Sequence, residues 1–197
     1  AFVKKLEREA FNLRYFTPVQ EVELCGHATI AAFTVLREEG VIKAGSYRAE
    51  TMAGSLEIEV SGKDIWMEMA APKTIKTFER EESIVLYASL ALDKSDEAEA
   101  MAPQIINTGL SDIMLPVKNQ RALETAVLNA REVSRLSAVY DVTGIHLFCL
   151  EEDQEITARC RNFAPACGID EESATGTYNG ALTWYLRQHS IIKPGEI

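Results

Sequence analysis

Cysteine, histidine and long apolar runs are all scarce in this sequence. The 197 residues include four cysteines and three histidines, and no two cysteines form a Cys-x-x-Cys pair. This excludes a disulfide-stapled scaffold and gives no ligand spacing typical of zinc, so no metal site is predicted. The longest apolar runs, at 30–36 and 84–92, fall far short of the roughly 18 residues that a membrane helix needs. We therefore expect no membrane partner.

Acidic residues outnumber basic residues in this sequence. Lysine and arginine total 20 against 30 aspartates and glutamates, which gives a formal net charge of −10 and a pI near 4.9. A surface of this sign repels phosphate backbones, so nucleic acid is not an expected partner. With 47% hydrophobic residues and only 11 glycines and 6 prolines, the chain has the composition of an ordinary globular protein that buries a core.

Both ends of the sequence have the pattern of a fragment. The chain starts at Ala1 and enters strand-like residues at once, and it stops after Lys193-Pro194-Gly195, a turn signal that normally introduces another element. We therefore expect a piece of a longer protein. The opening residues lack the charged and then apolar pattern of a secretory signal, and cysteine is sparse, so a cytoplasmic protein is predicted.

A strand, a buried helix and a sheet are predicted in the first part of the chain. The aromatic residues at 11–16 predict a strand that ends in a turn at Thr17-Pro18. The small and apolar residues that follow Cys25 predict a buried helix that Gly40 terminates. An antiparallel meander with tight glycine turns follows, with strands expected at 47–52, 55–60 and 65–69.

A second helix is predicted at 81–92, and the acidic segment 93–99 is expected to be a solvated loop and the domain boundary. Beyond it, strands are predicted at 105–108, 112–117, 138–142 and 147–150, with a helix at 120–130. The default expectation for several remaining residues is structural: a core position for Cys149 and Cys160, a core or lobe-interface position for Trp66 and Trp184, and no site role for His146 and His189.

The sequence contains an internal repeat, an echo of one segment in another, that relates these elements. Residues 14–18 resemble residues 161–165 at an offset of 147, with three of five positions identical. Each copy leads through a short loop to a glycine and a helix rich in small residues, at 25–33 and at 175–186. Two units of strand, turn and buried helix predict two related lobes.

Each repeated helix opens at a glycine, Gly26 in the first copy and Gly176 in the second. Unsatisfied backbone N–H groups and the positive end of the helix dipole attract a carboxylate at such a terminus. Two of them would suit a small anionic metabolite. The alternative is that both glycines only permit close packing of the helices.

The sequence closely resembles the phenazine-biosynthesis PhzF-like family, which shares the fold of diaminopimelate epimerase. The motifs that carry the resemblance span nearly the whole chain in the family's order: residues 14–18, 23–29, 107–110, 161–165 and 168–177. The resemblance implies an α+β fold of two pseudo-symmetric lobes, each a mostly antiparallel sheet wrapped around a central helix. We expect the lobes at 1–100 and 101–197. The sheets of this fold often pair, so a homodimer is one possible oligomeric state.

The resemblance also implies an isomerase or epimerase that moves a proton on a small carboxylate-bearing substrate in the cleft between the lobes, without a cofactor. His27 and Glu172 would be the catalytic residues, although the family usually has aspartate where Glu172 stands. The substrate-binding residues would be Cys25, Gly26, Thr175, Gly176 and Thr177, the last in place of the family's serine. The family's acid/base glutamate precedes a strand that matches residues 1–3, and would lie upstream of residue 1.

Three alternatives remain open, of which a purely structural lobe in a larger assembly is the least favoured because of the paired helices that open at a glycine. A non-catalytic module that binds small acids could use the same fold, since the glutamate lies outside the sequence and Glu172 replaces aspartate. A racemase of the epimerase type would use one thiol per lobe, with Cys25 at the first position. The second position holds Thr175, whose hydroxyl does not ionise near neutral pH, so Cys167 would have to reach the site.

Overall fold

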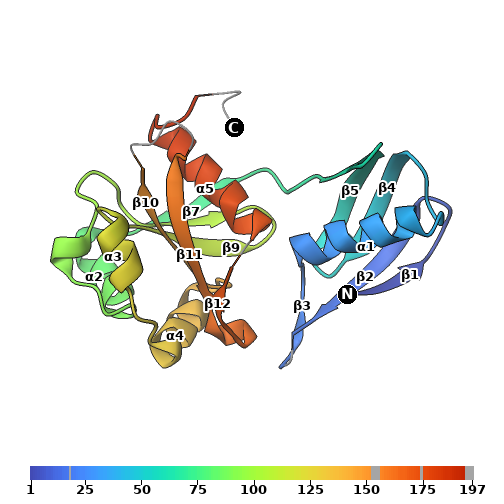
Figure 1. Cartoon of the computed structure of the whole chain (residues 1–197). Helices are drawn as coiled ribbons and strands as arrows, with labels where there is room; N and C mark the ends of the chain where they lie inside the picture. The colour runs from blue at the N-terminus through green and yellow to red at the C-terminus, as the bar shows by residue number, and fades with distance from the viewer. Residues whose placement is uncertain (18, 152–155, 174, 194–197) are drawn as a thin grey trace. The chain divides into compact units, whose positions relative to one another are not determined.

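The chain forms two compact units in the computed structural model, which describes residues 1–17, 19–151, 156–173 and 175–193 (Figure 1). Unit 1 is Ala1–Ala70 and unit 2 is Ala71–Ile197. The division falls earlier than the expected boundary near residue 100, because β7 (Lys73–Thr77) pairs with β8 (Gln104–Asn107) of the second sheet. Pro18 of the expected turn and residues 194–195 of the C-terminal turn signal lie outside the described residues.

Unit 1 contains one six-stranded sheet and the helix α1 (Gly26–Glu38). The strand order is β1-β2-β4-β5-β6, and β3 pairs with β2. All of these pairs are antiparallel except β2 with β4. The strands are β1 (Phe2–Lys5), β2 (Ala10–Phe16), β3 (Glu21–Val22), β4 (Gly45–Thr51), β5 (Gly54–Ser61) and β6 (Asp64–Met67). The predicted strand, helix and meander are confirmed. The helix is less buried than expected, since only Thr29 and Phe33 of its 13 residues are buried.

The core of unit 1 is built from aromatic side chains of the sheet and of α1. Phe11 and Phe33 meet edge to face with ring centroids 5.6 Å apart, and Tyr47 lies 6.2 Å from each. Between the same strand β2 and the same helix, the Tyr15 hydroxyl and Thr29 Oγ1 share a buried hydrogen bond of 2.6 Å. The outward face is polar, and Trp66 on it is 65% exposed. Of the two positions expected for Trp66, the core is therefore wrong, because its ladder partner Glu59 lies on the exposed face of β5. The lobe-interface position stays a prediction.

Unit 2 contains a second six-stranded sheet, in the order β12-β11-β10-β9-β8-β7. Only β9 and β10 run parallel. The new strands are β9 (Ser111–Pro116), β10 (Ile145–Leu150), β11 (Ala158–Ala164) and β12 (Ile169–Glu172). Gly144, just before β10, has no space for a side chain, since a Cβ there would lie 2.0 Å from the Phe163 carbonyl oxygen. A residue larger than glycine would push β10 away from β11.

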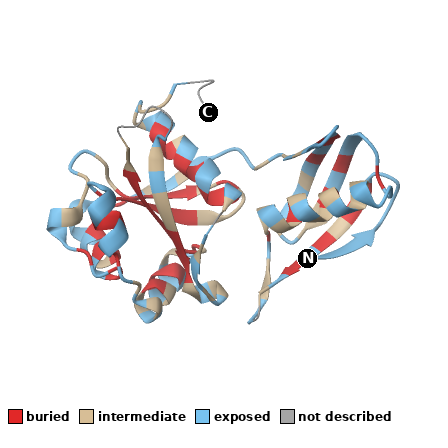
Figure 2. Cartoon of the chain, in the orientation of Figure 1, coloured by how far each residue is buried: buried red, intermediate tan, exposed pale blue. Residues whose placement is uncertain are grey.

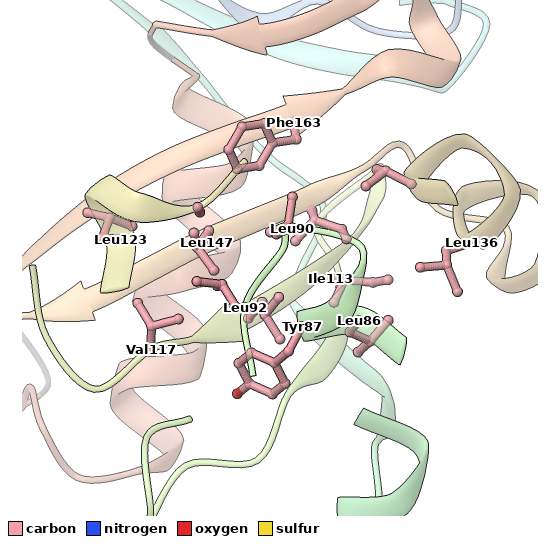
Figure 3. Close-up of a cluster of buried hydrophobic side chains, with 14 of the residues drawn as sticks. Leu86, Tyr87, Leu90, Leu92, Ile113, Val117, Leu123, Leu136, Leu147 and Phe163 are labelled. Atoms are coloured by element: carbon pink, nitrogen blue, oxygen red, sulfur yellow. The ribbon is translucent and has the colours of Figure 1, made fainter. Parts of the chain in front are cut away.

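Both faces of the second sheet are covered by helices (Figure 2). One face packs on α2 (Arg80–Ala88), α3 (Gln120–Thr125) and α4 (Ala130–Tyr140), where Ile113, Leu147 and Phe163 belong to a large apolar cluster (Figure 3). The opposite face packs on α5 (Gly176–Gln188). Strand alternation explains this division, because successive side chains point to opposite faces.

Some predicted elements of unit 2 differ from the observed ones. The strand expected at 138–142 is wrong, because residues 130–140 form α4, which buries Val133 and Leu136 on one face. The helix expected at 120–130 ends at Thr125 as the short α3. Within the acidic segment, residues 94–96 form a 3-10 turn instead of a plain loop.

Trp184 is half-buried against the α5 cluster, and its Nε1 donates to Thr74 Oγ1 at 3.2 Å. The α+β fold of two lobes is confirmed. In each unit a sheet packs on a helix of 13 residues that opens at a glycine. The additional helices α2, α3 and α4 distinguish unit 2 from unit 1.

Candidate functional site: two helix N-termini

In unit 1, the N-terminus of α1 brings together three of the predicted site residues. Cys25 is the N-cap, with an extended backbone at φ −143° and ψ 100°, and its side chain makes no cap hydrogen bond. Gly26 is the first helical residue, and His27 follows with an exposed imidazole. The Cys25 sulfur lies 3.5 Å from His27 Nε2 and 3.7 Å from Nδ1. A thiol and an imidazole therefore flank the positive end of the helix.

In unit 2, the N-terminus of α5 repeats this geometry. Its N-cap Thr175 has φ −148° and ψ 114°, and the side chain again makes no cap hydrogen bond. Thr175 Oγ1 instead lies 3.1 Å from Thr177 Oγ1. A Cβ at Gly176 would meet nothing within 4 Å, so the space beside this residue is open.

Charge reinforces the polarity of both helices. Neither has an acidic residue in its first turn, and each carries an arginine in its last turn, Arg37 in α1 and Arg187 in α5. An aspartate or glutamate in the first turn would compete with an incoming anion, because it would already neutralise the positive end of the dipole. The first turn of each helix is therefore suited to hold the carboxylate of a ligand.

The strands that lead to the helices also repeat, side chain by side chain. Arg14 of β2 forms a double ion pair with Glu21 at 2.7 and 2.8 Å, and Arg161 of β11 forms the same pair with Glu171 at 2.7 and 2.9 Å. The two guanidinium groups also lie over the rings of Phe16 and Phe163, at 5.1 and 5.0 Å. The echo in the sequence is therefore an echo in structure, with β10, β11, β12 and α5 repeating β1, β2, β3 and α1.

Glu172, the other predicted catalytic residue, ends β12 in unit 2. It is half-buried and pairs across the ladder with Asn162 of β11. Residues directly opposite each other in an antiparallel pair point to the same face of the sheet, so Glu172 and Asn162 share a face. Unit 2 thus contains Glu172 together with the threonines and glycine at the start of α5, while unit 1 contains Cys25, Gly26 and His27.

Sequence reasoning missed a buried polar group in unit 2. Asp112 of β9 is 0% exposed, and His146 and Asn162 on the next two strands are 2% exposed. Desolvation raises the pKa of Asp112 to about 8 and lowers the pKa of His146 to about 4. Burial also raises the pKa of Tyr178 in α5. The available signal was an aspartate inside the apolar strand predicted at 112–117.

Cys149 and Cys160 belong to the two apolar clusters that cover the second sheet. Cys149 is fully buried, and burial raises its pKa. Burial also raises the pKa of Cys160 to about 11, so both thiols remain protonated near neutral pH and are poor nucleophiles. His189 ends α5 and stacks on Tyr185 with ring centroids 4.4 Å apart, and burial lowers its pKa. His189 is therefore uncharged near neutral pH, which removes the favourable dipole interaction expected for a protonated imidazole.

Within the ranges that the structure describes, no three histidine, cysteine, aspartate or glutamate side chains are arranged to hold a metal ion. None of the helices in those ranges has the length and apolar character that a membrane crossing requires.

Comparison with known proteins identifies the family. The profile of the family described as "Phenazine biosynthesis-like protein" matches residues 1–196. An uncharacterized isomerase of Clostridium acetobutylicum is 34% identical over 195 residues, which cover 96% of this chain and 65% of that protein. The chain therefore spans slightly less than two thirds of this relative.

Solved structures agree with this assignment. A phenazine biosynthesis protein of the PhzF family from Bacillus anthracis matches with a TM-score of 0.80 and 30% identity, over 94% of this chain and 64% of that one. A structure described as a predicted epimerase of Pseudomonas aeruginosa has the same fold, with a TM-score of 0.77 and 21% identity over 99% of this chain and 68% of that one. Together with the profile match over residues 1–196, these likenesses show that the chain belongs to the phenazine biosynthesis-like (PhzF) protein family.

Proposed function

We propose that the protein is a PhzF-like isomerase that transfers a proton on a small carboxylate-bearing substrate without a cofactor. The observation that carries the proposal is the duplicated helix start, with two N-caps of nearly equal backbone angles and no acidic residue in either first turn. Such termini stabilise a carboxylate, and they stabilise the negative charge that develops when a carbon next to it loses a proton.

The acid/base roles follow from the side chains at these helices. His27 and Glu172 are the proposed catalytic residues, since imidazole and carboxylate groups can both accept and return a proton near neutral pH. Gly26 and Gly176 offer backbone N–H groups to the substrate, and Thr175 and Thr177 offer hydroxyls. The family's glutamate, expected upstream of residue 1, would act as the proton shuttle in the longer protein. We propose that this protein is located in the cytoplasm.

The test is solvent-deuterium incorporation. The longer protein, which includes the upstream glutamate, is incubated in D2O with a panel of small carboxylic acids that carry an activated C–H bond, and loss of the proton signal is followed by NMR. His27→Ala and Glu172→Gln should each lower the rate of incorporation at least about a hundredfold, which is the usual contribution of a general acid or base.

Two matched variants control for folding. His189→Ala removes a histidine at the other end of α5, and Asp170→Asn neutralises a second carboxylate of β12. Both should retain the wild-type rate. If His27→Ala and Glu172→Gln also retain it, these residues are not catalytic and the proposed mechanism is wrong.

A second candidate function is a module that binds small acids without chemistry. It is favoured by Glu172, whose extra methylene moves the carboxylate by about a bond length from the place of the family's aspartate, enough to cost a large factor in rate. In that case the ligand would shift the NMR signals of the amides at the starts of α1 and α5, while no acid in the panel would incorporate deuterium.

A further inference from the structure

Helix α5 packs on a sheet face with two chemically different halves. Along β10, the His146 ring lies 5.6 Å from the Tyr178 ring, and the Phe148 ring lies 5.2 Å from the Tyr185 ring. The C-terminal half of the helix, with Tyr185, therefore rests on apolar side chains. The N-terminal half rests on polar ones, although it is equally buried.

The polar half comes from three neighbouring strands. Asp112, His146 and Asn162 lie on β9, β10 and β11, at most 2% exposed, and Tyr178 of α5 covers them at 4%. Among the described residues, five of their polar atoms lack a hydrogen bond of ordinary length and angle: both carboxyl oxygens of Asp112, Nε2 of His146, Nδ2 of Asn162 and the hydroxyl of Tyr178. So many unsatisfied groups in one place are unusual, because each costs about 1–3 kcal/mol when buried alone.

These groups nevertheless interact with one another. His146 Nδ1 lies 3.3 Å from Asn162 Oδ1. The Tyr178 hydroxyl interacts with the side chains of both Asp112 and Asn162, while Asp112 also interacts with Thr143 and His146 with Asn179. The four side chains thus form a connected network beneath the start of α5.

The network is attached to both parts of the proposed site in unit 2. Tyr178 directly follows Thr177, whose carbonyl oxygen accepts a hydrogen bond of 3.4 Å from the buried Thr108 hydroxyl. At the other end, Asn162 is the ladder partner of Glu172 and shares its face of the sheet. A movement within the network would therefore displace the first turn of α5 and the end of β12.

We propose that Asp112, His146, Asn162 and Tyr178 are positioning residues, which hold the first turn of α5 and Glu172 in the geometry that the substrate requires. The inference rests on the proposed function, because it assigns a role to residues behind that site. Apolar side chains would bury the same surface at lower cost, as they do under Tyr185. What the polar network adds is directional bonding, which fixes orientation where dispersion contacts only exclude water.

The network acts in its uncharged form. Asp112, with its raised pKa, keeps its proton near pH 7 and can donate a hydrogen bond, while neutral His146 has one donor and one acceptor nitrogen. Burial raises the pKa of Tyr178, so its phenol is neutral there as well. Glu172 is the further ionisable side chain on this face, as the ladder partner of Asn162.

Amide hydrogen exchange in the full chain tests the proposal, with Tyr178→Phe compared against Tyr185→Phe. The matched control lies on the same helix, and its hydroxyl donates to the Ala102 carbonyl at 2.8 Å, away from the network. The reporters are the amides of residues 179–181, which bond to carbonyls in the first turn. Tyr178→Phe should speed their exchange about tenfold, the factor for one net hydrogen bond, and Tyr185→Phe should leave them unchanged. Equal exchange in both variants would overturn the proposal.

Asp112 supplies a second readout. Asp112→Asn keeps a neutral hydrogen-bonding group of the same size, so protection of residues 179–181 should stay close to wild type. Asp112→Leu should lose that protection even when the rest of unit 2 keeps its own. Loss of protection throughout unit 2 in Asp112→Leu, with normal protection in Tyr178→Phe, would mean that the network only supports the fold and would also overturn the proposal.

The failure of the proposed function would be visible separately. In the same samples, sodium acetate is titrated as a carboxylate probe while the amide signals of Gly176 and Thr177 are followed. If the wild-type protein shows no acetate response, the anion site of the proposed function is wrong. The positioning role is judged on exchange at residues 179–181 alone.

Discussion

Asp112 links the buried network to pH. Its pKa is raised to about 8 in the folded chain, while an unfolded aspartate titrates near 4, so between these values the folded state holds a proton that the unfolded state has lost. The stability contributed by protonated Asp112 is complete below about pH 4 and is lost as the pH rises through about 8. The free energy of unfolding should therefore fall by roughly 1 kcal/mol per pH unit in this window.

His146 acts in the opposite direction over part of the window. Its folded pKa of about 4 lies below the unfolded value near 6.5, so its contribution is lost as the pH falls from 6.5 to 4. Only the Asp112 contribution changes between about pH 6.5 and 8. Urea unfolding across this range should show a falling stability in the wild type and a markedly flatter profile in Asp112→Asn. A profile that is the same in both proteins would contradict the raised pKa of Asp112.

At the scale of elements, the strand pairs β2–β3 and β11–β12 have the same geometry, but their arginines form different contacts. Arg14 binds Glu21 at the surface. Arg161 binds Glu171 and also donates to the carbonyl oxygens of Leu123 and Ala126 at 3.0 and 2.8 Å, at the end of α3. The second arginine therefore joins β11, β12 and α3, whereas the first joins only β2 and β3.

This difference predicts unequal costs. Arg161→Ala should destabilise unit 2 by about 2 kcal/mol or more, since it removes charge-assisted bonds to two backbone carbonyls. Arg14→Ala should cost clearly less, because an exposed ion pair contributes little. Urea denaturation measures the difference when it is followed by the NMR amide signals of unit 1 for Arg14→Ala and of unit 2 for Arg161→Ala. Equal shifts of the two midpoints from their wild-type values would show that the carbonyl contacts add nothing.

The helices differ in whether they could be predicted from the sequence. Helices α1 and α5 were predictable because a glycine opens each one and small and apolar residues follow. Helix α4 was not, because the segment 138–142, which overlaps its last turn, has the composition of a strand. The burial of Val133 and Leu136, three positions apart, shows the helical period of α4. Its start was not predicted, because the helix expected at 120–130 ran through the loop between α3 and α4.

The residues of the candidate site also differ in whether the sequence predicts them. Residues at the two helix starts were predictable because their motifs are local in sequence. The network of Asp112, His146, Asn162 and Tyr178 was not, because its members are brought together by strand register. His146 and Asn162 are opposite each other only because β10 and β11 pair as they do, and no local pattern encodes that pairing.

For the whole molecule, the two units place non-equivalent residues at equivalent positions. The N-cap of α1 is Cys25 and the N-cap of α5 is Thr175, with almost the same backbone angles. A symmetric two-thiol mechanism needs an ionisable group at both caps, and the threonine hydroxyl cannot supply one near neutral pH. The other candidate thiol, Cys167, ends the 3-10 turn Pro165–Cys167, eight residues before Thr175.

Serine substitution decides between thiol and carboxylate chemistry. Alkylation of Cys25 would be ambiguous, since a bulky adduct beside His27 blocks the helix start whatever the mechanism. Cys25→Ser and Cys167→Ser change one atom each, and both variants should keep deuterium incorporation within about tenfold of wild type if His27 and Glu172 carry the proton. A loss of about a thousandfold or more in both would instead identify the two sulfurs as the acid and base, because a serine hydroxyl cannot replace a thiolate. The asymmetry between Cys25 and Thr175 favours the first outcome.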